Sequence, residues 1–179
     1  SYHNDVSWQY WKPQYRYYNQ KILEKYYINH QDDVHFWMFV QYEFDKQWQA
    51  LKNYAHQCGI EIIGDVPIYV ALDSCDVWAN TKLFQLDKEL KLIKVAGCPP
   101  DAFCEEGQLW GNPLYNYKIM KTDHYKWWTN RIKKATNYMM SLESIILEVL
   151  NRIMRFHQEI KLLKMVNGKK DLVIPFLKQ

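Results

Sequence analysis

The chain has 179 residues, of which 48% are hydrophobic and 24% are charged, so it can form one packed domain or part of one, and disorder is not the default expectation. The net charge of +3 is too small to indicate nucleic-acid binding, and the surplus lies in Leu142–Gln179, which holds seven basic and four acidic residues. Eight Trp, 14 Tyr and seven Phe residues suit either a large aromatic core or a surface that stacks on sugars or bases.

Cysteine spacing and hydropathy exclude further classes. Cys58, Cys75, Cys98 and Cys104 show no CxxC spacing and no histidine at ligand spacing, so we predict no zinc site. Scattered thiols in a chain of this length are typical of a reducing compartment, and we expect a cytoplasmic protein. We expect no signal peptide and no membrane partner, because the first residues are polar and aromatic and no apolar run is long enough to span a bilayer.

Residues 1–31 are aromatic and polar, and we expect irregular structure there with a short helix near Gln20–Tyr27. From Asp32 onward, apolar residues recur at steps of three and four, which predicts a helix with one buried face. We expect Asp32 or Asp33 to cap its start and Gly59 to end it. The periodic positions are Val34, Trp37, Met38, Val40, Phe44, Trp48, Leu51, Tyr54 and Ala55.

The next segment, Ile60–Val70, reads IEIIGDVPIYV, which indicates a parallel strand buried on both faces. Gly64 and Pro67 weaken a strand interior, so we expect the strand to end near Asp65. A carboxylate at the C-terminal end of a parallel strand lies where α/β folds place their active sites. The residues alone equally allow Asp65 to cap a turn.

The rest of the chain is expected to be loop with short elements over residues 71–117, followed by helices. Asp123 is expected to cap a helix through Tyr125, Trp128, Ile132 and Ala135, and Leu142–Val166 shows a second helical period. This order of helix, strand, long loop and helix predicts an α/β fold, either part of a (β/α)8 barrel or doubly wound. A loop of this length inside a compact domain is usually functional.

The stretch CPPDAFCEEGQLWGNPLYNY, from Cys98 to Tyr117, is too rich in Pro and Gly for a helix and too irregular for a strand. Trp110, between glycine-permitted turns, can present a flat face to a sugar, with Asp101, Gln108 and Asn112 beside it to bind hydroxyl groups. The residues alone also allow Trp110 to fill a core and Asp101 to cap a turn. No nucleophile with a partner base, P-loop or dinucleotide motif stands out in the sequence.

A family resemblance rests on long motifs. GIEIIGDVPIYVALDSCDVWAN, followed by VAGCPPDAFCEEGQLWGNPLYNY, resembles the 4-alpha-glucanotransferases, or amylomaltases, of glycoside hydrolase family 77. VQYEFDKQWQALKNYAHQCGI and YKWWTNRIKKA resemble the family's flanking helices, and DVSWQYWKP is a weaker match. The resemblance covers residues 1–136. It implies a catalytic (β/α)8 TIM barrel with long strand-to-helix loops, of which this chain is expected to hold an incomplete part without the first strand.

The resemblance implies an enzyme that needs no cofactor or metal and passes α-1,4-glucan segments between maltooligosaccharides by a retaining double displacement. Asp65 and Tyr69 would face the substrate from the end of a barrel strand. Asp101, Gln108 and Trp110 would lie on a mobile loop that keeps water from the glycosyl-enzyme. Asn112, chosen for its amide, completes the predicted substrate-binding set.

The resemblance stops after RIKKA. The family continues with its nucleophile motif, roughly YDVxRIDHFRGF, whereas this chain reads TNYMMSLESIILEVLNRIM, and the family's acid/base Glu and further Asp are absent as well. The sequence therefore predicts no catalytic residue here. Permitted codons for Leu142–Leu150, read from the third base of the first codon, give Arg-Ile-Asp-His-Phe-Arg-Gly-Phe. We expect residues 137–179 to be an out-of-frame tail whose helical period has no function.

Two hypotheses follow. The chain is either an incomplete 4-alpha-glucanotransferase, inactive by itself, or a glucan-binding module that lacks catalysis. A partial barrel has open sheet edges, so we expect the chain to fold poorly alone. Nucleic-acid binding by the basic tail is rejected because its surplus charge is small. The sequence does not indicate an oligomeric state.

Overall fold

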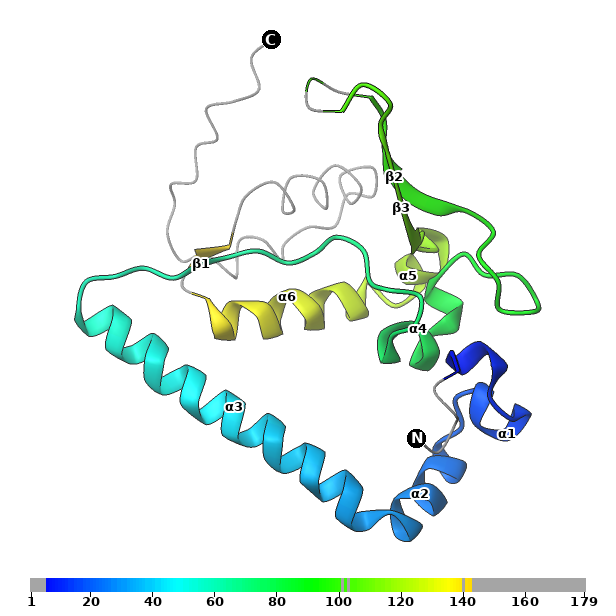
Figure 1. Ribbon diagram of the computed structural model, residues 1–179, viewed down its shortest axis with the longest axis horizontal. Coiled ribbons are helices and arrows are strands. Elements are labelled where there is room, and N and C mark those ends of the chain that lie inside the picture. The colour runs from blue at the N-terminus through cyan, green and yellow to red at the C-terminus, as the bar shows by residue number, and fades with distance from the viewer. Residues whose placement is uncertain (1–5, 101, 103, 140, 143–179) are drawn as a thin grey trace. The chain divides into compact units, whose positions relative to one another are not determined.

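The computed structural model describes residues 6–100, 102, 104–139 and 141–142 of the chain (Figure 1). The chain forms two compact units, each built from segments that are distant in sequence. Unit 1 consists of Ser1–Val40 and Tyr69–Tyr125, and unit 2 of Gln41–Ile68 and Lys126–Gln179.

Unit 1 starts with short helices. Residues 6–30 form η1 (Trp8–Tyr10), α1 (Pro13–Arg16) and α2 (Gln20–Asn29). Asn19 caps α2, because its side-chain oxygen accepts hydrogen bonds from the N–H groups of Lys21 and Ile22 at 3.0 and 3.3 Å. The predicted short helix near Gln20–Tyr27 is confirmed.

The long helix predicted from Asp32 is confirmed as α3 (Gln31–Gln57). It begins one residue earlier than predicted, so Asp32 and Asp33 lie inside its first turn, where they complement the helix dipole instead of capping the helix. Gly59 ends the helix as predicted, with φ of +72° and its N–H donating to the carbonyl of His56. No helix in the described part of the chain, α3 included, is long and apolar enough to cross a membrane.

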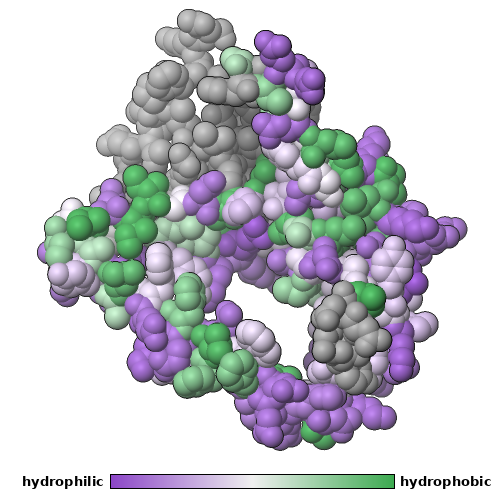
Figure 2. All heavy atoms as spheres, in the orientation of Figure 1, coloured by the Kyte–Doolittle hydropathy of each residue, from purple (hydrophilic) through white to green (hydrophobic). Residues whose placement is uncertain are grey.

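The single buried face predicted for α3 is not found. Ala55 is the only buried residue of this helix, all of whose residues are described. Side chains on all sides of its first half are 58–64% exposed, namely Phe36, Trp37, Met38, Phe39 and Tyr42. Hydrophobic residues are visible at the surface along this helix in Figure 2. A helix that is apolar all round cannot be covered by a single neighbouring element.

Unit 2 contains a parallel strand pair. β1 (Ile63–Gly64) pairs with β4 (Ser141–Leu142), and α6 (Lys126–Tyr138) precedes β4. The parallel strand predicted within Ile60–Val70 is confirmed, and Asp65 follows its last residue. Its predicted burial on both faces is wrong, because Ile63 is 67% exposed. β1 has two residues and pairs with a single strand in the described part of the chain, so its two faces are not both covered.

The second half of α3 meets α6 within unit 2. The indole N–H of Trp48 donates to the carbonyl of Tyr138 at 2.7 Å, and the Tyr138 hydroxyl donates to Asp45 at 2.7 Å. The ring of Phe44 stacks on Trp48 with centroids 6.3 Å apart. These contacts hold the C-terminal end of α6 against α3, just before the chain enters β4.

The loop predicted over residues 71–117 is confirmed to contain short elements, but one expectation for Cys98–Tyr117 is wrong. Unit 1 contains α4 (Cys75–Ala79), η2 (Thr81–Leu83), α5 (Tyr117–Thr122) and an antiparallel hairpin of β2 (Val95–Cys98) and β3 (Gln108–Pro113) (Figure 1). Part of the stretch predicted to be too irregular for a strand, Gln108–Pro113, therefore forms β3. Gly97 permits this close pairing, since a Cβ there would collide with the carbonyl oxygen of Gln108.

Asp123 does not cap the helix predicted through Trp128. It is the C-cap of α5, and His124 and Tyr125 follow with φ of 57° and 56°. Two left-handed residues in succession cannot continue a helix, so α6 starts after them at Lys126. The predicted helix itself is confirmed, whereas the helix predicted over Leu142–Val166 lies outside the described residues from position 143 onward.

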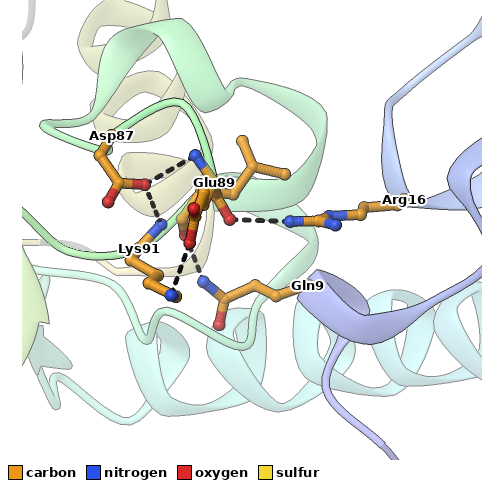
Figure 3. A network of polar contacts seen from close by, with 6 residues as sticks. Gln9, Arg16, Asp87, Glu89 and Lys91 are labelled. Carbon is orange, nitrogen blue, oxygen red and sulfur yellow. Dashed lines mark hydrogen bonds and ion pairs between the residues drawn. The ribbon is translucent and has the colours of Figure 1, made fainter.

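The two segments of unit 1 are joined by a polar network (Figure 3). The side-chain amide of Gln9 donates to the carbonyl of Leu90, and the guanidinium of Arg16 donates to that of Glu89 at 2.8 Å. The Asp87 carboxylate accepts from the backbone N–H groups of Glu89 and Lys91 at 2.8 and 2.9 Å. This network holds the turn in which Leu90, buried and non-glycine, adopts a φ of 66°.

Candidate functional site

A row of aromatic rings in unit 1 runs from the core to the surface. Phe84 contacts Tyr115 with ring centroids 5.3 Å apart, and Tyr115 stacks on Tyr69 at 5.8 Å with 15° between the ring planes. Tyr69 contacts Trp110 at 6.1 Å with a tilt of 54°. Tyr115 is 1% exposed and Trp110 is 47% exposed. The outer end of the row therefore offers aromatic surface on a rigid base.

Strand β3 sets the position of Trp110. Residues two apart on a strand share a face, and the indole N–H of Trp110 donates to the side-chain oxygen of Gln108 at 2.8 Å. Gly111 follows with φ of +75°, a conformation that other residues adopt at a cost. Trp110 thus has a satisfied N–H and a half-exposed ring, with the Gln108 amide beside it.

Asn112 ties the hairpin to the segment that bears Tyr69. Its side-chain amide donates to the carbonyl of Val70 at 3.0 Å. Val70 itself and Pro113, which follows Asn112, are both buried. The hydrogen bond therefore fixes the backbone beside Tyr69 to β3.

The phenols around this row are held neutral. Burial raises the pKa of Tyr117 well above its ordinary value, and the phenols of Tyr69 and Tyr125 raise it further. Burial also raises the pKa of Tyr69 and of Tyr125. At neutral pH these phenols stay protonated. They can therefore donate hydrogen bonds, but they cannot take up a proton as a phenolate base would.

The structure brings together four of the six predicted site residues. Tyr69, Gln108, Trp110 and Asn112 lie in unit 1 around the hairpin. Asp65 lies in unit 2, where its carboxylate accepts the N–H of Val66 at 2.7 Å. Asp101 lies outside the described residues. In the described part of the chain, no three His, Cys, Asp or Glu side chains are placed to hold a metal ion.

Sequence reasoning missed Tyr115 and Phe84. Neither was singled out, although Tyr115 is part of the quoted stretch and touches both Tyr69 and Phe84. No local pattern marks Tyr115 as buried, since it lies two residues beyond the end of β3. Phe84 gave no local signal, since its contact with Tyr115 joins distant segments.

Known proteins match most of the chain. The family model for 4-alpha-glucanotransferase, glycoside hydrolase family 77, matches residues 1–142. A 4-alpha-glucanotransferase of Clostridium butyricum is 48% identical over 133 residues, which are 74% of this chain and 27% of that protein. A chloroplastic/amyloplastic 4-alpha-glucanotransferase of Solanum tuberosum is 42% identical over 134 residues, which are 75% of this chain and 23% of that protein.

A solved structure shows the same similarity. The amylomaltase from Streptococcus agalactiae, in complex with acarbose, superposes with a TM-score of 0.70 at 37% identity, over 79% of this chain and 29% of that one. The chain thus spans about a quarter of the length of these relatives. Since the family model matches residues 1–142 of 179, the chain belongs to the 4-alpha-glucanotransferases of glycoside hydrolase family 77.

Proposed function

We propose that this chain supplies glucan-binding surface to a 4-alpha-glucanotransferase, which transfers α-1,4-glucan segments between maltooligosaccharides by a retaining double displacement. The observation that carries the proposal is the half-exposed ring of Trp110, tilted against Tyr69 and hydrogen-bonded to Gln108, in a member of this family. The acarbose complex of the Streptococcus agalactiae amylomaltase supports oligosaccharide binding.

The geometry suits a curved glucan. The C–H faces of glucose are apolar and pack on aromatic rings, while its hydroxyl groups need hydrogen bonds. An α-1,4-linked chain curves, so two rings tilted by 54° fit successive sugars better than two coplanar rings would. Gln108 can hydrogen-bond a hydroxyl beside the Trp110 ring. Closure of such a surface over the sugar excludes water, which favours transfer over hydrolysis.

The two aspartates and Asn112 belong to the same proposal. Asp65 directly follows β1, the position from which parallel strands present side chains to a substrate. Asp101, in the chain between β2 and β3, would bind sugar hydroxyls from the loop. The side-chain nitrogen of Asn112 already donates to the Val70 carbonyl. Asn112 would therefore aid glucan binding through its side-chain oxygen, or by fixing the segment that bears Tyr69.

We propose that unit 2 is part of a (β/α)8 barrel. Its elements alternate as helix, strand, helix, strand, and β1 and β4 are parallel neighbours separated by α6. A helical crossover between adjacent parallel strands is the repeating unit of this barrel. We also propose a cytoplasmic location, which the four cysteines support, because none of these described residues forms a disulfide.

The chain as encoded is proposed to be inactive, because residues 137–179 form an out-of-frame tail. The family match ends at residue 142, a few residues beyond the proposed slip. In the shifted register Asn137–Leu142 allows Leu-Tyr-Asp-Val-Phe, and the following codons allow the nucleophile motif. Two of three bases in most shifted codons are fixed by the visible residues, with a further choice only at Ser, Leu and Arg, so this agreement leaves little freedom.

The alternative function is a glucan-binding module without catalysis. It is favoured by the ordered placement of Tyr69, Gln108 and Trp110 in a chain whose residues after RIKKA do not read as the family's nucleophile motif. Saturable binding of maltooligosaccharides by the chain as encoded would support this alternative. Failure of the chain to fold would support an incomplete transferase.

Substitution of Trp110 tests glucan binding. Trp110→Ala should weaken binding of maltoheptaose by about tenfold, because it removes an aromatic contact worth roughly 1 to 2 kcal/mol. Trp37→Ala is the matched control, since this indole is 64% exposed on α3. Isothermal titration gives the affinities, and thermal unfolding should show little change for either variant. Equal affinities of the Trp110→Ala and parent chains would contradict the proposal.

A further inference from the structure

We propose that Tyr115 is a positioning residue for glucan binding, whose buried ring orients Tyr69 and thereby sets the tilt between Tyr69 and Trp110. The inference rests on the proposed function and adds to it a residue that need not touch the sugar.

The ring of Tyr115 is fixed from the core side. It is 1% exposed, and its backbone pairs with that of Phe84 in an isolated antiparallel bridge. The side-chain amide of Gln85 donates to the Tyr115 carbonyl at 3.0 Å. The Phe84 ring, 3% exposed, lies 5.3 Å from the Tyr115 ring. Both the backbone and the ring of Tyr115 are therefore held by buried neighbours.

Tyr69 has no comparable support from its own backbone. It lies in a bend outside any helix or strand, between Ile68 and Val70. Asn112 fixes the adjacent Val70 carbonyl, which anchors the chain but not the torsions of the Tyr69 side chain. The near-parallel contact with Tyr115, 5.8 Å between centroids and 15° between planes, fixes the plane of the Tyr69 ring.

A flat partner is essential for this role. Aromatic rings in near-parallel contact constrain each other's planes, whereas a branched aliphatic side chain fills volume without defining a plane. Tyr115→Phe should therefore preserve the orientation of Tyr69, while Tyr115→Leu should let that ring rotate. Because Tyr69 borders Trp110 at 6.1 Å, the rotation would change the surroundings of the indole.

The full chain labelled with 5-fluorotryptophan provides the test, with the Trp110 signal assigned by Trp110→Phe. Tyr115→Leu should shift the ¹⁹F resonance of Trp110 and weaken maltoheptaose binding by about three- to tenfold. Tyr115→Phe should leave both unchanged. Trp8→Leu is the matched control, because it removes another ring of unit 1 that is only 2% exposed. Thermal unfolding is measured for every variant.

The outcomes separate the two roles. If Tyr115→Leu and Trp8→Leu weaken binding in equal measure and in step with their loss of stability, Tyr115 is merely structural and the inference is overturned. An unchanged Trp110 resonance in a folded Tyr115→Leu chain also overturns it. If the parent chain does not bind maltoheptaose, the proposed function fails, while the resonance still tests the positioning. Tyr115→Met, whose unbranched side chain adapts better to the space left by the ring, replaces a leucine variant that does not fold.

Discussion

At the scale of single residues, the phenol of Tyr117 makes unit 1 sensitive to alkaline pH. Burial is the main cause of its raised pKa, followed by the neighbouring phenols of Tyr69 and Tyr125. The unfolded chain therefore loses this proton first, near pH 10. The stability contributed by the neutral phenol is complete below about pH 10 and is lost as the pH rises toward the folded-state pKa.

Tyr117→Phe should therefore flatten the fall of the melting temperature between about pH 10 and pH 11.5. The decline should not vanish, because burial also raises the pKa of Tyr69 and Tyr125. Tyr10→Phe is the matched control, since this side chain is 74% exposed. Thermal melts across the alkaline range check the prediction, and equal slopes for the parent and Tyr117→Phe chains would refute it.

Sequence reasoning identified the exposed end of the aromatic row but not its buried end. Trp110 was predictable because turn residues flank a single large ring, a pattern that indicates a presented side chain. The choice between a sugar platform and a core plug needed its exposed fraction of 47%. Tyr115 was not predictable, because its role depends on Phe84 and Tyr69, which reach it from distant positions.

At the scale of elements, two glycines of the hairpin should differ in their tolerance of a methyl group. Gly97→Ala places a Cβ against the Gln108 carbonyl, so the strands must separate, and we expect a loss of about 2 kcal/mol or more. Gly111→Ala meets no atom within 4 Å but keeps φ of +75°, which costs about 1 kcal/mol. Chemical denaturation should rank Gly97→Ala as the more damaging change, and the reverse order would show that the described pairing is wrong.

The elements also show which local signals are reliable. α3 was predictable because apolar residues recur at steps of three and four from Val34 to Ala55 and Gly59 ends the helix. β3 was missed because two of its six residues are glycine and proline, which usually exclude a strand. The partner strand β2 compensates through Gly97 and a register shift beside it. Asp123 was predicted to start the helix through Trp128, whereas it ends α5. The sequence did not distinguish the two positions, because an aspartate between two helices can lie at the end of the first or at the start of the second.

At the scale of the whole molecule, the account predicts a chain without turnover. The chain as encoded should release no glucose from maltotriose and should not lengthen it into larger maltooligosaccharides, because the proposed register slip replaces the nucleophile motif. The product of the gene with its register restored should do both. Product analysis of the two purified proteins, compared with a preparation from cells that lack the gene, checks the prediction. Turnover by the chain as encoded would show that the catalytic carboxylates have been assigned wrongly.

Only the family resemblance predicts a barrel for this chain. Local sequence gave a helix, a strand and a long loop, and these fit both a barrel and a doubly wound sheet. The parallel pairing of β1 with β4 joins residues that are 78 positions apart, as for Ile63 and Ser141. No local pattern encodes a contact of that separation, so the sheet order had to come from the structure.

The central claim is that the chain is a glucan-binding piece of a transferase whose coding register slips before the nucleophile. The nucleotide sequence of the gene from Lys133 to Leu150 tests this claim most directly. The account predicts that the codons of Leu142–Leu150, read from the third base of the first, spell Arg-Ile-Asp-His-Phe-Arg-Gly-Phe, with the slip located near Lys133–Asn137. Codons that cannot give this peptide in either shifted register would contradict the account.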